Sequence, residues 1–234
     1  MLAAIALHLL ALAQVPSPGA ALAEEGPTSP PGTAAPSETP ARSTRERQLS
    51  LLSATPLGGG SAALVEAGWP SIGARYAQGL SSVDDLGALL DFDWSKTELR
   101  LGAFYRRPLE PLPPMDTALR LSLAWYADFG GEWIHSDNRG DRGFEITPAL
   151  VFSRQRPGGV FAGQLELPIT ITVRHGGGLL LAPRLTFSYE APLYGAYTVG
   201  VRGGFGYRFG AGSAPLRDGL AEIVFLVVGG YRVF

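Results

Sequence analysis

Residues 160–174 read VFAGQLELPITITVR, and their side chains alternate in character along the whole run. The odd positions are apolar or glycine, whereas the even positions include Gln164, Glu166, Thr170 and Arg174. Successive side chains of a β-strand point to opposite faces of the sheet, so the run predicts a strand with one apolar and one polar face. It is also longer than the strands of soluble proteins, which usually span about 5 to 6 residues.

The same two-residue period continues through most of the chain after residue 48, where we find no convincing helical period. Between residues 86 and 209 it outlines further strands in which the apolar phase carries no charge, and an earlier strand covers about residues 65–80. The sequence therefore predicts an all-β protein. The opposite phase carries arginine and carboxylate side chains in similar numbers: Asp85, Asp91, Asp93, Glu98, Arg100, Arg106, Arg120, Asp128, Glu145, Glu166, Arg174, Arg184, Glu190, Arg202 and Arg208.

Two architectures use such alternation, and they differ in which face meets the surroundings. A soluble barrel or sandwich turns its apolar face inward, whereas a transmembrane barrel turns it toward lipid and points its polar face into the lumen. Strand length favours the second, because a tilted membrane strand needs about 9 to 11 residues. Composition agrees, since charged residues make up only 17% of the chain and Lys96 is its only lysine.

The cost of a misplaced charge also favours the membrane architecture. One arginine or lysine at the bilayer midplane of a barrel costs about 2–4 kcal/mol, so hydrocarbon enforces a clean apolar phase. Aromatic residues fall near the ends of the predicted strands, as they do in the girdles that membrane barrels place at headgroup level. These residues are Trp94, Tyr105, Trp125, Phe129, Phe144, Phe161, Tyr197, Tyr207 and Phe209.

The chain ends inside a predicted strand at Phe234, with Gly229 shortly before it. In alternation, strand length and terminus, residues 48–234 resemble bacterial outer-membrane β-barrel proteins, whose last strand commonly ends in Phe. The resemblance implies a place in the outer membrane, contact with its lipid, and recognition of Phe234 as a signal by the barrel insertion machinery. Arg232 departs from that signal, which prefers an apolar residue there, and an outward Arg232 would snorkel to the membrane edge.

We expect a closed antiparallel up-and-down transmembrane β-barrel of ten strands, with eight as the alternative, because bacterial single-chain barrels have an even number. Nine strands are legible in the sequence. Residues 48–57, QLSLLSATPL, are the candidate for the tenth strand, with Gly58 to Gly60 as its turn. Both faces of the last strand are apolar, which leaves its phase open.

Two segments precede the predicted barrel. Residues 1–23 contain an apolar run and an A-x-A site at Ala21 and Ala23, which is typical of a secretory signal peptide, although no Lys or Arg precedes the run. Residues 24–47 are rich in Pro, Ser, Thr and Ala and predict a disordered linker. The absence of cysteine excludes disulfide and thiolate chemistry.

Either strand number gives a narrow barrel, because side chains just fill the interior of an eight-stranded one. With arginines and carboxylates facing inward, we expect an ion-pair and hydrogen-bond network in the lumen rather than an open pore. Its predicted members are Arg100, Arg106, Arg120, Glu166, Arg184, Glu190, Arg202 and Arg208.

Candidate catalytic residues are few. His135 and Ser136 supply the residue types of a membrane-embedded lipid deacylase, but they are neighbours on one loop, whereas such a triad usually draws its members from different elements. Asp91 and Asp93 lie on one face and could share a proton, as the paired acids of a rim protease would. Arg100 and Arg106 on the next strand favour structural ion pairs instead.

We expect no cofactor and no metal, since no His, Asp and Glu cluster has ligand spacing, and no nucleic-acid partner, since the net charge is -2. The favoured function is therefore a monomeric, non-enzymatic outer-membrane barrel with a structural or surface-contact role. The alternatives are a membrane-embedded rim hydrolase acting on lipid or peptide, a narrow channel, and a soluble binding barrel.

Overall fold

The structure is a computed structural model that describes residues 50–130, 140–173, 177–212 and 220–233. The chain divides into two compact units, residues 1–45 and 46–234, and every described residue belongs to the second. The predicted signal peptide, the linker, His135, Ser136 and Phe234 lie outside the described residues. Among the described residues, no helix is long and apolar enough to cross a membrane.

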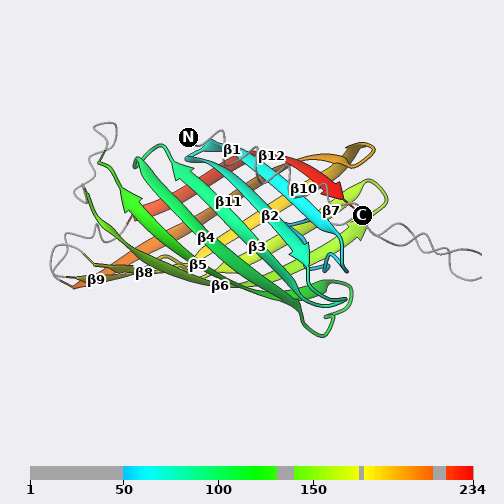
Figure 1. Cartoon of the computed structure of the whole chain (residues 1–234), viewed down its shortest axis with the longest axis horizontal. Helices are drawn as coiled ribbons and strands as arrows, with labels where there is room; N and C mark the ends of the chain where they lie inside the picture. Colours follow the sequence, from blue (N-terminus) through cyan, green and yellow to red (C-terminus); the bar gives the residue numbers. More distant parts are fainter. Residues whose placement is uncertain (1–49, 131–139, 174–176, 213–219, 234) are drawn as a thin grey trace, which may run out of the picture. The chain divides into compact units, whose positions relative to one another are not determined.

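The second unit is a closed antiparallel β-barrel of ten strands (Figure 1). Two of the ten are interrupted, so the wall contains twelve segments, and closure is completed where β12 pairs with β1. The segments are β1 (Ser61–Trp69), β2 (Ser71–Gly79), β3 (Asp85–Asp93), β4 (Glu98–Pro108), β5 (Asp116–Asp128), β6 (Arg142–Arg156), β7 (Gly159–Glu166), β8 (Ile169–Thr172), β9 (Gly178–Leu181), β10 (Arg184–Tyr194), β11 (Tyr197–Gly212) and β12 (Leu220–Val233).

Prolines cause the two interruptions. Leu165 pairs with Leu150 and Ile169 pairs with Ile146, so β7 and β8 follow β6 in one unbroken register. Pro168 lies between them, and its carbonyl accepts a hydrogen bond from the amide of Ala182 at 3.0 Å. Proline has no N–H group, so it cannot donate the reciprocal hydrogen bond to the neighbouring strand. Pro183 separates β9 from β10 in the same way.

The apolar faces of the strands point away from the barrel axis, and the charged faces point into the lumen. Leu165 is 51% exposed and Val201 is 46% exposed, whereas Arg202 is 5% exposed and Glu166 is 6% exposed. This is the inverse of a soluble core and confirms the orientation expected from the alternation. Exposed outward side chains from the other strands include Val65, Ile72, Leu90, Leu101, Leu121, Leu123, Phe144, Phe187, Phe205, Ile223 and Val227.

The two ends of the barrel differ. One end, where β1 begins and β12 ends, carries the connections after β2, β4, β6 and β10, and the structure describes all four. We call it the plug end. The other end, the far end, carries the tight turns after β1 and β3 and the loops after β5, β8 and β11.

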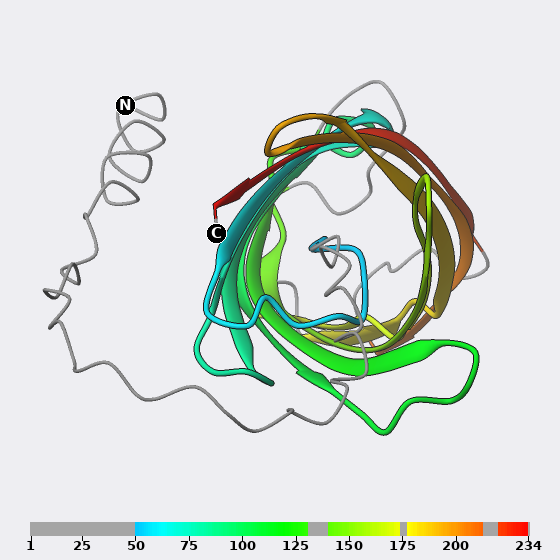
Figure 2. The same cartoon turned by 90° about the vertical axis from the view of Figure 1, so that its right-hand side faces the viewer.

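The ten-strand prediction is confirmed, but the predicted tenth strand is wrong. Residues 65–80, expected to form one strand, belong to a hairpin of β1 and β2 that turns at Pro70, and this hairpin supplies the extra strand. Residues 50–57 contain no strand and lie inside the ring of strands, where the blue segment is visible down the barrel (Figure 2). We call residues 50–57 the plug.

Candidate functional site

The plug is held in the lumen by wall side chains that bond to its backbone. The Nη1 atom of Arg106 donates to the carbonyl oxygens of Ser50 at 3.0 Å and Ser53 at 2.6 Å. The Oδ1 atom of Asp85 accepts a hydrogen bond from the backbone amide of Leu57 at 2.9 Å. Arg106 and Asp85 also pair with each other at 2.7 Å, and both are almost fully buried. One ion pair of the wall therefore fixes both ends of the plug.

Further contacts surround the middle of the plug. The amide of Ala54 donates to Ser153 Oγ at 2.9 Å, and the side-chain amide of Gln164 donates to the carbonyl of Leu52 at 3.2 Å. The hydroxyl of Ser50 bonds to the carboxylate of Glu190. The leucine side chains of the plug join the main buried cluster, which contains Leu51, Leu52, Leu57, Ala62, Leu64, Ala77, Phe104 and Val228. The plug end is thus filled by chain atoms whose backbone is bonded to the wall at several points.

A network of five charged side chains crosses the lumen beyond the plug; we call it the central network. Arg202 of β11 pairs with Glu66 of β1 at 3.0 Å and with Glu166 of β7 at 3.1 Å. Arg120 of β5 also pairs with Glu166, at 2.6 Å, and Arg75 of β2 pairs with Glu66 at 3.1 Å. Because these strands lie around the whole wall, the network connects opposite sides of the barrel.

A second group of charges lies toward the far end, around Glu222 of β12. This carboxylate pairs with Lys96 at 3.0 Å, with Arg184 at 2.9 Å and with Arg208. Lys96 is shared with Asp93 at 3.5 Å, whose other oxygen accepts hydrogen bonds from Ser95. This Glu222 cluster, defined as Glu222, Asp93, Lys96, Arg184 and Arg208, has three cationic side chains for two carboxylates.

The opposite imbalance occurs around Arg100 of β4. Arg100 pairs with Glu98 at 2.5 Å and with Glu145 of β6 at 3.5 Å, and it lies directly across from Asp91 of β3. We call these four residues the Arg100 cluster. It has three carboxylates for one cation. Asp91 forms no ion pair with any described residue, and its shielded Oδ1 atom has no hydrogen-bond partner there.

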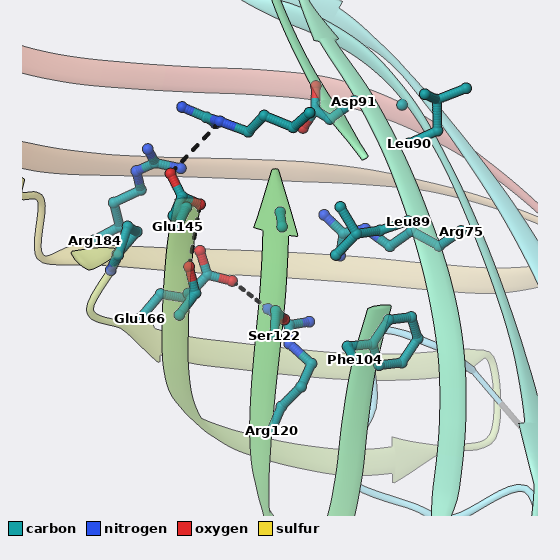
Figure 3. A pocket seen from close by; sticks show the side chains of 15 residues that line it. Arg75, Leu89, Leu90, Asp91, Phe104, Arg120, Ser122, Glu145, Glu166 and Arg184 are labelled. Carbon is teal, nitrogen blue, oxygen red and sulfur yellow. Dashed lines mark hydrogen bonds and ion pairs between the residues drawn. The ribbon is translucent and has the colours of Figure 1, made fainter. Parts of the chain in front are cut away.

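Two cavities lie among these groups. The larger, of about 240 Å³, extends from the central network to the turns at Pro70 and Lys96. The smaller, of about 80 Å³, is lined by Asp91, Glu145, Glu166 and Arg184, and Figure 3 shows Asp91 and Arg184 on opposite sides of it. Five charged residues line both cavities: Arg75, Asp91, Arg100, Glu166 and Arg184.

The predicted lumen residues fall into separate groups rather than one network. Arg106 and Glu190 contact the plug, Arg120, Glu166 and Arg202 belong to the central network, and the other three lie in the clusters toward the far end. Those three are Arg100, Arg184 and Arg208. All eight side chains point into the lumen, and each pairs with a side chain of opposite charge or with a hydroxyl group.

Arg232 does not point outward, as a snorkelling residue would. It is 8% exposed and lies 3.6 Å from Glu190 in the lumen, near the plug end. The pairing of β12 with β1 explains this placement, because Arg232 is opposite Ala62, which is buried on the inner face. The apolar character of both faces of β12 had hidden its phase in the sequence.

The candidate catalytic residues do not assemble into a recognisable site. Asp93 is engaged with Lys96 and Ser95, and Asp91 lies next to Arg100 rather than in a hydrogen bond with Asp93. Arg106, expected near these acids, is at the plug end beside Asp85. Within the described part of the chain, no group of three or more His, Asp or Glu side chains could hold a metal ion.

Several important lumen residues were not singled out from the sequence. Glu66 and Arg75 were hidden because the turn at Pro70 was read as part of one strand, and Glu222 because the phase of the last strand was open. Residues 48–57, which include the plug, were predicted to form a strand of the barrel wall. A signal was present in its composition, because residues 50–57 contain Pro56 and three serine or threonine residues, which suit a lipid-facing strand poorly.

A scan against models of protein families and searches of curated proteins and of solved structures found no match for this chain.

Proposed function

We propose that this chain is an outer-membrane β-barrel protein with a non-enzymatic structural or surface-contact role and a lumen that does not conduct. The observation that carries the proposal is the orientation of the wall, with apolar side chains outward on every strand and paired charges inside. Lipid is the surrounding that such an exterior suits, because a closed wall leaves no unpaired sheet edge in hydrocarbon.

The distribution of aromatic side chains supports the membrane assignment. Toward the far end, the rings of Trp69 and Trp94 meet edge to face with their centroids 4.7 Å apart, and the ring centroids of Tyr207 and Phe209 are 4.8 Å apart. Toward the plug end, further pairs are Phe161 with Tyr189 at 4.6 Å and Tyr197 with Tyr231 at 5.0 Å. Two such girdles, separated by outward aliphatic side chains, match the two headgroup levels of a bilayer.

The contents of the lumen favour a closed barrel over a channel. The plug fills one end with backbone and leucine side chains, and the central network spans the cross-section behind it. An ion would have to break two sets of buried contacts to cross. Residues 1–23 as the export signal and Phe234 as the insertion signal complete the proposal.

Cell fractionation tests the proposal directly. We expect the mature chain to follow the outer membrane and to migrate differently in electrophoresis when it is heated, because the barrel resists unfolding in cold detergent. Recovery in the soluble fraction without detergent, with no heat-dependent shift in mobility, would overturn it.

Conductance in planar bilayers separates the closed barrel from the channel. The intact protein and an Arg106→Gln variant, which loosens the plug, are both expected to give no stable conductance steps, because the central network remains. Regular steps from the intact protein would reject the closed-lumen part and favour the channel alternative.

A further inference from the structure

The larger cavity is lined by eleven charged side chains, six of them cationic and five anionic. They come from all three groups. Asp91 and Arg100 of the Arg100 cluster line it, whereas Glu98 and Glu145 do not. The lining is therefore nearly neutral, and the unmet needs of the cavity are those of individual polar atoms.

Unpartnered atoms occur on both sides of the same cavity. Asp91 lines it and has a shielded carboxylate oxygen without a hydrogen-bond donor. Arg202 and Arg208 line it as well, are less than one-tenth exposed, and each has a shielded Nε–H without an acceptor among the described residues. Buried polar atoms are nearly always satisfied, so the cavity is short of one donor group and of acceptor groups.

We propose that this cavity binds a small zwitterion. Its cationic ammonium group lies at Asp91, and its anionic carboxylate or phosphate lies toward Arg184 and Arg208. A zwitterion supplies a donor and acceptors at once, whereas an anion or a cation alone satisfies one side. The volume of about 240 Å³ is below the range of drug-sized ligand pockets, which suits a compact molecule.

This inference does not depend on the membrane assignment, because the cavity lies inside the barrel. Fractionation of the chain with soluble proteins would reject the proposed function and leave the zwitterion site standing. Failure to bind zwitterions would leave the membrane assignment untouched.

Isothermal titration calorimetry on the folded full chain in detergent micelles tests the site. The probes are three zwitterions of increasing length, glycine, 4-aminobutanoate and 6-aminohexanoate, with hexanoate and hexylammonium as singly charged controls. We expect saturable binding of at least one zwitterion, with an affinity at least about tenfold higher than that of either control. No saturable binding of any zwitterion, or equal binding of a singly charged control, would overturn the proposal.

Variants then assign the two ends of the ligand. Asp91→Asn is expected to lower the affinity for the best zwitterion at least about tenfold, and Arg208→Gln to lower it as well. Glu110→Gln, which removes an exposed carboxylate in the loop after β4, is the matched control and is expected to change nothing. Full affinity in Asp91→Asn would remove the ammonium site and with it the proposal. If that variant does not fold, the comparison of probes on the intact protein decides alone.

Discussion

Glu166 accepts ion pairs from two arginines of different strands, Arg120 at 2.6 Å and Arg202 at 3.1 Å. Glu166 is 6% exposed, so bulk solvent hardly reaches its carboxylate. A buried ion pair adds little stability compared with a well-packed apolar pair, but removing one partner leaves an uncompensated buried charge. Without Glu166, Arg120 would lose the carboxylate with which it pairs, whereas Arg202 would keep Glu66.

We therefore expect Glu166→Gln to lower the free energy of unfolding by about 3–5 kcal/mol. Unfolding in urea, followed by tryptophan fluorescence in detergent micelles, measures the change. Arg107→Gln is the control, because Arg107 lies 3.9 Å from Asp84 with a side chain 62% exposed, and exposed pairs contribute only about 0–1 kcal/mol. Equal losses in the two variants would contradict a buried network.

For a single residue, the sequence predicts the face of the strand on which it lies, but not the residue that it contacts. Alternation was enough to place Arg106, Arg120 and Arg202 in the lumen, because a strand has only two faces. Their partners depend on how each strand is staggered against strands far away in the sequence. Arg202 contacts Glu66, which comes from the other end of the chain and meets β11 only after the wall has closed.

Among the elements, the plug tests the filled-lumen account. Leu52 is 1% exposed and packs in the main buried cluster, so we expect Leu52→Ala to lower the free energy of unfolding by about 2–5 kcal/mol. Leu112→Ala is the matched control, since Leu112 is 61% exposed in the loop after β4. The same urea titration compares them, and a Leu52→Ala protein as stable as the control would mean that the plug is not docked in the barrel.

The close approach of β6 and β8 depends on a residue without a side chain. A methyl group on Gly143 would lie 1.9 Å from the carbonyl oxygen of Ile171, whereas one on Gly229 would meet nothing within 4 Å. We expect Gly143→Ala to destabilise the barrel by about 1–3 kcal/mol and Gly229→Ala to change it by less than about 0.5 kcal/mol. Thermal or urea unfolding of both variants measures this difference, and a neutral Gly143→Ala would argue against the described register.

The two errors made from the sequence arise at the scale of elements. The stretch QLSLLSATPL was read as a strand, although Leu51, Leu52 and Leu57 pack inside the barrel rather than outside it. The hairpin at Pro70 was missed because apolar residues continue on both sides of the turn. Periodicity within a segment does not reveal whether that segment pairs with a neighbour, which only the closed wall decides.

For the whole molecule, closure and orientation give one consistent account. Ten strands leave no free edge, the outward faces carry the apolar side chains, and nearly all lumen charges have a partner. The strand number was predicted from the even-number rule for single-chain bacterial barrels, and ten is what the structure has, although one of the assigned strands was wrong. The set of side chains around the larger cavity was not predictable, because it depends on residues from five or more strands meeting in space.

The central claim is that the outward face meets hydrocarbon, and spin-label accessibility measures this directly. The chain has no cysteine, so single cysteines along β5 can carry a nitroxide without any other change. In liposomes, labels at Leu119, Leu121 and Leu123 should collide freely with oxygen and hardly with a water-soluble nickel complex, while labels at Ser122 and Ala124 should be shielded from oxygen. If the nickel complex reaches the three leucine positions freely, the barrel faces water and the account is wrong.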